Sequence, residues 1–137
     1  MKKIFLDANI IIDLIEKRQL NESGADKLME KFPHAQIYIS ALSVHIIFHI
    51  LHIKAGSKTH KKVLEFLTFV KITPLTDSII SLANKTRYSD YEDTLQYLMA
   101  LHADCDYILT RDKKDFENVK KIIPSKIKII TNLSQIK

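Results

Sequence analysis

Three aspartates stand where predicted strands end or a predicted helix begins: Asp7, Asp93 and Asp112. In an open α/β sheet the carboxyl ends of parallel strands meet at one crevice, so we expect these acids to lie together. Carboxylates held together raise one another's pKa unless a cation neutralises them. Mg²⁺ and Mn²⁺ are hard cations that prefer oxygen ligands. The three acids therefore indicate metal-assisted attack on a phosphodiester bond.

Each acid taken alone also has an ordinary structural explanation. Asp7 could simply cap the helix that follows it, and Asp93, with Asp90 and Glu92 beside it, could complement a helix dipole. The three acids together are stronger evidence for a site than any one of them.

Polar and basic residues accompany the acids. Asn9 could orient Asp7 through its side-chain amide, Thr110 offers a hydroxyl to the crevice, and Glu92 could support Asp93. Basic residues near Asp112 could contact substrate phosphates, although basic residues in loops are also commonly just solvated. These candidates for substrate binding are Arg111, Lys113 and Lys114.

The elements that must position these residues alternate between strands and helices. Short apolar strands separated by helical stretches predict βαβ units, a mainly parallel central sheet and a three-layer α/β/α fold. Asn9 is expected to cap the first helix, Ser40 or Ser43 the third, and Asp77 the fifth. The predicted strands span 3–6, 36–39, 70–72, 106–110 and 126–131, and the predicted helices span 10–16, 23–32, 40 or 43 to 54, 59–69, 77–87, 91–103 and 115–119.

Length and composition indicate an ordinary globular protein. The 137 residues predict a single domain over 1–137, with 46% hydrophobic and 27% charged residues. The net charge of +5 suits a polyanionic partner or a generally lysine-rich surface. With a single cysteine, Cys105, and two glycines, the chain has no thiolate metal cluster and no glycine-rich phosphate loop. We expect a cytoplasmic protein, because no apolar run could span a bilayer and Asp7 comes too soon for a signal peptide.

The segments FLDANIIID, DYEDTLQYLMAL and YILTRDKKDF, followed by IKIIT, together resemble a PIN domain, as in the toxin half of VapBC-type toxin–antitoxin pairs. The resemblance implies a Mg²⁺- or Mn²⁺-dependent ribonuclease with a parallel sheet, and usually a homodimer. It matches Asp7, Asp93 and Asp112 to the metal-binding acids and Asn9 and Thr110 to accompanying polar positions.

One position departs from the family pattern. The resemblance places a glutamate three residues after Ser43, where this chain has Ile46, and isoleucine cannot bind a metal. Glu92 could substitute for it, or His49, which suits Mn²⁺ better than Mg²⁺.

The resulting hypothesis is a metal-dependent endoribonuclease, the toxin of a toxin–antitoxin pair, that cleaves RNA through metal-activated water. Its implied partners are an RNA substrate, a protein antitoxin and a second copy of the chain. One alternative is an inactive PIN-like domain that binds RNA or a protein. Another is a phosphohydrolase, although such enzymes commonly carry a second aspartate where this chain has Asn9.

Overall fold

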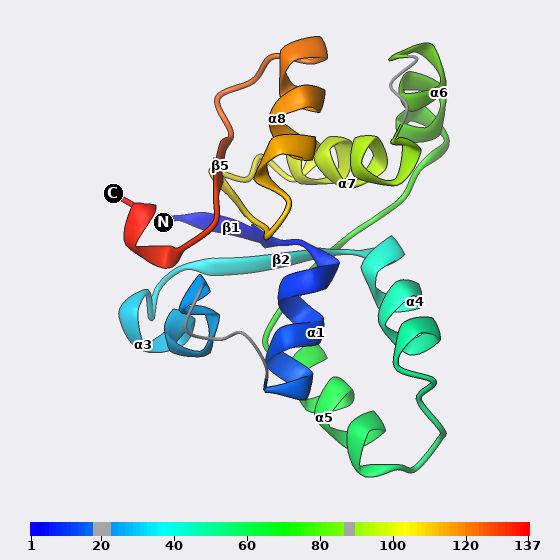
Figure 1. Cartoon of the computed structure of the whole chain (residues 1–137), viewed down its shortest axis with the longest axis vertical. Coiled ribbons are helices and arrows are strands. Elements are labelled where there is room, and N and C mark those ends of the chain that lie inside the picture. The colour runs from blue at the N-terminus through cyan, green and yellow to red at the C-terminus, as the bar shows by residue number, and fades with distance from the viewer. Residues whose placement is uncertain (18–22, 87–89) are drawn as a thin grey trace.

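The computed structural model describes residues 1–17, 23–86 and 90–137, and its centre is a five-stranded sheet (Figure 1). The strand order is β3-β2-β1-β4-β5, and every pairing between neighbours is parallel, which confirms the predicted parallel α/β fold. The strands are β1 Lys3–Leu6, β2 Gln36–Ser40, β3 Lys71–Thr73, β4 Tyr107–Leu109 and β5 Lys128–Ile130.

Helices cover both faces of the sheet and complete the three layers. Helices α1, α3, α4 and α5 lie on one side, and α6, α7 and α8 lie on the other (Figure 1). The helices are α1 Ala8–Glu16, α3 Leu28–Lys31, α4 Ala41–Ile50, α5 Lys58–Leu67, α6 Asp77–Thr86, α7 Tyr91–His102 and α8 Lys113–Ile122, with 3₁₀ turns η1 Ala25–Lys27 and η2 Leu133–Gln135.

The central strands are buried on both faces because their side chains alternate between the two helical layers. Ile4 and Leu6 of β1 belong to the core under α1 and α4, whereas Phe5 packs with Tyr97 of α7 and Phe116 of α8. A strand buried on both sides reads as an apolar run, which explains why β1 and β4 could be predicted from the sequence.

The register between β1 and β4 brings the predicted site together. Leu6 lies opposite Leu109, so the residues that follow the two strands, Asp7 and Thr110, emerge side by side. The Asp7 backbone N–H continues the ladder by donating to the Leu109 carbonyl oxygen at 3.0 Å.

Two predicted caps are wrong. The first helix begins at Ala8 and is capped by Asp7, not Asn9, because Asp7 has extended backbone angles and accepts the Ala8 N–H at 2.8 Å. In α6 the Thr76 hydroxyl oxygen, rather than Asp77, accepts the N–H of Ile79. Ser40, one of the two predicted alternatives, caps α4 by accepting the Ser43 N–H.

Several predicted boundaries also differ. The helix expected over 23–32 is a 3₁₀ turn followed by the single turn of α3, and α4 ends at Ile50 because His52 adopts a left-handed backbone with φ of 48°. Helix α8 extends beyond the predicted helix at both ends, and it begins at Lys113 because Asp112 already occupies its N-cap position. The strands β4 and β5 are shorter than the predicted strands 106–110 and 126–131.

No helix within residues 1–17, 23–86 and 90–137 combines the length and the apolar character needed to cross a bilayer.

Candidate active site

Asp7 is a buried acid at the carboxyl end of the sheet, with 6% of its surface exposed. Its Oδ1 accepts the Ala8 N–H, and its Oδ2 accepts the Thr110 hydroxyl at 2.7 Å. Burial raises the pKa of Asp7 from 3.8 to about 6, although these two hydrogen bonds oppose the rise. The negative charges of Asp112 and Glu92 add to it, so both acids lie near Asp7.

The side chains of Asn9 and Thr110 connect Asp112 to the segment that carries Asp7. The Asn9 amide donates to Asp112 Oδ2 at 3.0 Å, and the Asp112 backbone N–H donates to the Thr110 hydroxyl oxygen at 2.9 Å. Thr110 is fully buried, and because its hydroxyl also donates to Asp7, it links Asp7 to the backbone that carries Asp112. The structure thus brings together four of the residues predicted from the sequence.

Asp93 reaches the site from the other helical layer and lies within a group of three acids. One carboxylate oxygen from each of Asp90, Asp93 and Asp115 lies within 4.8 Å of the others. Burial raises the pKa of Asp93 from 3.8 to about 8, and its contact with Asp90 and the charges of Asp90, Asp7 and Asp115 contribute further. Asp93 therefore connects this group electrostatically to Asp7.

Glu92 is exposed at the start of α7 but lies close enough to the acids to affect Asp7. Partial burial and then the charge of Asp90 raise the pKa of Glu92. Of the two substitutes considered for the glutamate of the family pattern, Glu92 is the one whose contacts place it among the acids.

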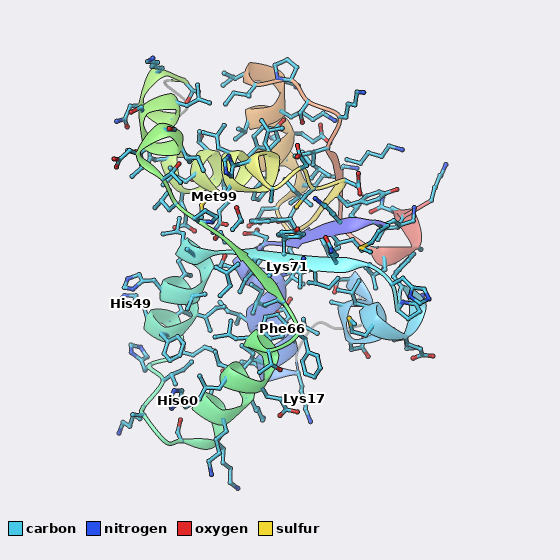
Figure 2. The ribbon with its side chains drawn as sticks, turned by 180° about the vertical axis from the view of Figure 1, so that it is seen from behind. Lys17, His49, His60, Phe66, Lys71 and Met99 are labelled. Carbon is cyan, nitrogen blue, oxygen red and sulfur yellow. The ribbon has the colours of Figure 1, made fainter. Side chains whose placement is uncertain are left out.

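His49 lies in a different environment. It is exposed on α4, and its ring is stacked with that of His45 at a centroid distance of 6.1 Å. Figure 2 shows His49 projecting outward from α4, with Met99 marking α7 beyond the sheet. No contact described for His49 links it to the acids within the parts of the chain that the structure describes.

Helix α4 contacts α7 through a buried polar network near Ile46. The Gln96 amide donates to the Ser43 hydroxyl oxygen at 3.1 Å, and the Ser40 hydroxyl donates to the same oxygen. Ser40, Ser43 and Gln96 are all fully buried. Ile46 follows Ser43 by about one helical turn and is half-buried, so the departure from the family pattern lies close to this contact with α7.

The predicted substrate-binding residues have different surroundings. Lys113 and Lys114 are exposed in the first turn of α8, next to Asp112. Arg111 is engaged with α1, because its Nε lies 3.1 Å from Oδ2 of the buried Asp13.

The acids fit a hard divalent cation. The groups that converge are carboxylate, hydroxyl and amide oxygens, which are the ligands that Mg²⁺ and Mn²⁺ prefer. Burial, and after it the charges of neighbouring acids, raise the pKa values of Asp7 and Asp93, so a bound cation would favour the charged forms of both carboxylates.

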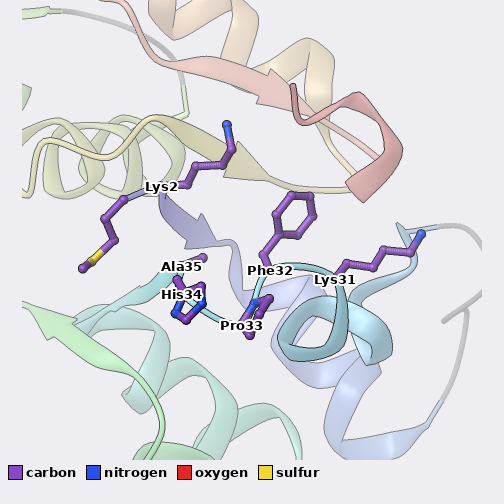
Figure 3. Close-up of a pocket in the computed structure, with 7 residues that line it drawn as sticks. Lys2, Lys31, Phe32, Pro33, His34 and Ala35 are labelled. Carbon is purple, nitrogen blue, oxygen red and sulfur yellow. The ribbon is translucent and has the colours of Figure 1, made fainter.

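An open apolar pocket of about 440 Å³ lies elsewhere (Figure 3). Its walls come from the segments before β1 and β2, so it lies at the amino ends of the strands, away from the acids. It is lined by Met1, Lys2, Lys31, Phe32, Pro33, His34 and Ala35.

Asp90 and Asp115 were not among the residues assigned to the site from the sequence. In the sequence, Asp90 lies close to Asp93, and Asp115 lies within the segment that carries the family resemblance. Their convergence depends on the packing of α7 against α8, where Tyr97, Phe116 and Val119 share one buried cluster.

Comparison with known proteins bears on the family and the fold. The family model described as PIN domain matches residues 3–114. The chain belongs to the PIN domain family. This membership confirms the resemblance seen in the sequence.

Individual relatives of this PIN domain protein cover most of its length. A protein named Ribonuclease VapC1, from Aquifex aeolicus (strain VF5), is 25% identical over 122 residues, covering 82% of this chain and 83% of the relative. The crystal structure of VapBC2 from Rickettsia felis, bound to a DNA fragment from their promoter, matches with a TM-score of 0.71 and 16% identity over 95% of this chain and 98% of that one. The structure of FitAB bound to an IR36 DNA fragment matches with a TM-score of 0.67 and 16% identity over 98% and 97%. At these identities the two structures support the fold.

Proposed function

We propose that this PIN domain protein is a divalent-metal-dependent endoribonuclease and the toxin of a toxin–antitoxin pair. The observation that carries the proposal is the convergence of acids from three distant chain segments at the carboxyl end of the sheet. Asp7, Asp93 and Asp112 come from the ends of β1 and β4 and the start of α7. The name of the VapC1 relative supports RNA as the substrate.

In this proposal the chain's residues hold and orient the acids. Asp7, Asp93 and Asp112 would hold Mg²⁺ or Mn²⁺, with Asp90, Glu92 and Asp115 adding negative charge nearby. A bound ion of this kind supplies Lewis acidity and lowers the pKa of water. Thr110 fixes one oxygen of Asp7, and Asn9 fixes one oxygen of Asp112, so neither carboxylate has to be reoriented.

Substrate contact would come from the basic rim. Lys113 and Lys114 are exposed beside Asp112, where they could meet phosphates on either side of the scissile bond. Arg111 belongs to the same rim, although its Nε is occupied by Asp13.

A protein partner and a second copy of the chain are part of the proposal. Two structural neighbours, VapBC2 and FitAB, are each bound to DNA. An antitoxin that places a basic side chain among Asp7, Asp93 and Asp112 would neutralise the same charge as the metal. Competition between the antitoxin and Mn²⁺ for the free protein would test that idea.

The nuclease proposal is tested by cleavage of single-stranded RNA in the presence of Mn²⁺. The variants are Asp112→Asn, which keeps the shape of the side chain, and Glu65→Gln, a matched loss of one exposed carboxylate on α5. We expect Asp112→Asn to lose about 100-fold in rate and Glu65→Gln to behave like wild type. A wild-type protein without metal-dependent cleavage, or an Asp112→Asn variant as active as wild type, would contradict the proposal.

One observation favours a second candidate, an inactive PIN domain that binds RNA. Ile46 occupies the place of the fourth acid of the family pattern, so the metal site has one ligand fewer. This alternative predicts RNA binding that is the same in Mn²⁺ and in a chelator, with no cleavage in either.

A further inference from the structure

Three consecutive residues after β4 all reach towards α1. Thr110 donates to Asp7, the Arg111 side chain pairs with Asp13, and Asp112 accepts from Asn9. The Arg111 backbone N–H also points to the Asn9 side-chain oxygen, at 3.4 Å. The tripeptide that carries one proposed metal ligand is therefore fastened along the segment that carries another.

Asp13 is the deepest of these anchors and the farthest from the proposed metal ligands along α1. It is fully buried, and its Oδ2 lies 3.1 Å from Arg111 Nε, while the Arg111 side chain is 32% exposed. A buried carboxylate is costly unless a cation compensates it, so the pairing with Arg111 is strongly favoured over separation. Asn9 and Asp13 are four residues apart and share one side of α1.

We propose that Asp13 and Arg111 are positioning residues that hold the β4–α8 turn against α1 and so set the distance between Asp7 and Asp112. In this role Arg111 acts through the backbone that it anchors. The metal-binding part of this inference rests on the proposed function, whereas the anchoring of the turn does not.

The competing role for Arg111 is direct contact with an RNA phosphate. That role predicts weaker RNA binding in an Arg111 variant but no change in the affinity of the RNA-free protein for metal. Measuring Mn²⁺ affinity without RNA therefore separates the two roles.

The experiment compares Mn²⁺ affinity, by titration calorimetry or electron paramagnetic resonance, in wild type, Asp13→Asn, Arg111→Gln and the double variant. Positioning predicts that each single variant loses about 10-fold in affinity. It also predicts that the double variant resembles either single one, because both changes remove the same pairing.

The change in charge alone predicts the opposite effect of Arg111→Gln on Mn²⁺ affinity. Arg111→Gln removes a positive charge beside the carboxylates, which by itself would tighten Mn²⁺ binding. An Arg111→Gln protein that binds Mn²⁺ as tightly as wild type or tighter, or single-variant effects that cancel in the double variant, would overturn the inference.

A second measurement needs no metal. In the protein kept metal-free by a chelator, Asp13→Asn should accelerate amide hydrogen exchange at Arg111 and Asp112 by about 10-fold. The ranking of protection among the β4 amides should stay as in wild type. The control is Ser57→Ala, which removes the N-cap of α5 and lowers stability away from the site. Equal acceleration in both variants would show a merely structural role and contradict the proposal. If wild type binds no Mn²⁺, the proposed function fails, while hydrogen exchange still decides whether Asp13 anchors the turn.

Discussion

Replacing Asp93 by asparagine should make the metal-free protein more stable at alkaline pH while removing its response to Mn²⁺. The pKa of Asp93 is raised from 3.8 to about 8, first by burial and then by Asp90 and the other acids. The folded state therefore binds the Asp93 proton more tightly than the unfolded state. This contribution to stability is complete below about pH 4 and is lost as the pH rises through about 8.

The size of the effect follows from the same pKa. A rise from 3.8 to about 8 would correspond to about 6 kcal/mol for a fully buried group, at about 1.4 kcal/mol for each pKa unit. Asp93 is only half-buried, and solvent screening reduces the expected value to about 1–2 kcal/mol. Asparagine resembles the protonated acid and can still donate to Asp90, so the variant should keep this contact without the charge.

The assay is urea unfolding in a chelator at roughly pH 5 and roughly pH 9, repeated with Mn²⁺. We expect Asp93→Asn to gain on wild type by about 1–2 kcal/mol as the pH rises between these values. Mn²⁺ should stabilise wild type by mass action and leave the variant almost unchanged. A variant destabilised equally at both pH values, or stabilised by Mn²⁺ as much as wild type, would refute the reasoning. Glu65→Gln, an exposed change on α5, controls for the loss of one charge.

Three further predictions concern the neighbouring residues. Ile46→Glu should raise Mn²⁺ affinity about 10-fold by supplying another carboxylate, and it should lower the stability of the chelated protein. Calorimetry would measure the affinity and urea unfolding the stability. Unchanged affinity would place residue 46 outside the site. Thr110→Val should remove the hydrogen bond that lowers the pKa of Asp7, and it should lower the free energy of unfolding by about 1 kcal/mol. Because the pKa of Asp7 then rises further above about 6, the midpoint of Mn²⁺ binding should move to higher pH, and a shift to lower pH would be inconsistent with this assignment. Lys113→Ala and Lys114→Ala in the Asp112→Asn background should each weaken RNA binding and reduce its salt slope by about 0.7, with no effect if these lysines are only solvated.

Much of the fold could be predicted because a parallel strand that is buried on both faces forms an apolar run in the sequence. The run before Asp7 and the run before Thr110 are apolar throughout, since both faces of β1 and β4 are covered by helices. Once these strands are parallel and adjacent, Asp7 and Asp112 must emerge at the same edge. The capping of α1 could not be decided in this way, because Asp7 and Asn9 both suit the N-cap position.

The rest of the site depends on packing between elements that are distant in sequence. Asp115 meets Asp93 only because Phe116 and Tyr97 pack α8 against α7, and no local pattern encodes that separation. The pairing of Asp13 with Arg111 likewise depends on packing between elements that are distant in sequence. In the sequence, Asp13 is one more polar residue in an apolar helix, and its burial becomes apparent only in three dimensions.

The register of β1 against β4 also determines when the site can exist during synthesis. Asp7 and Thr110 are 103 residues apart, although their side chains are hydrogen-bonded. β1 can pair with β2 early, but its other edge stays open until β4 has left the ribosome. A nascent chain that has produced Asp7 and Asp93 therefore carries the acids without the turn that aligns them. The proposed metal site is therefore complete only after the chain has been made through Asp112.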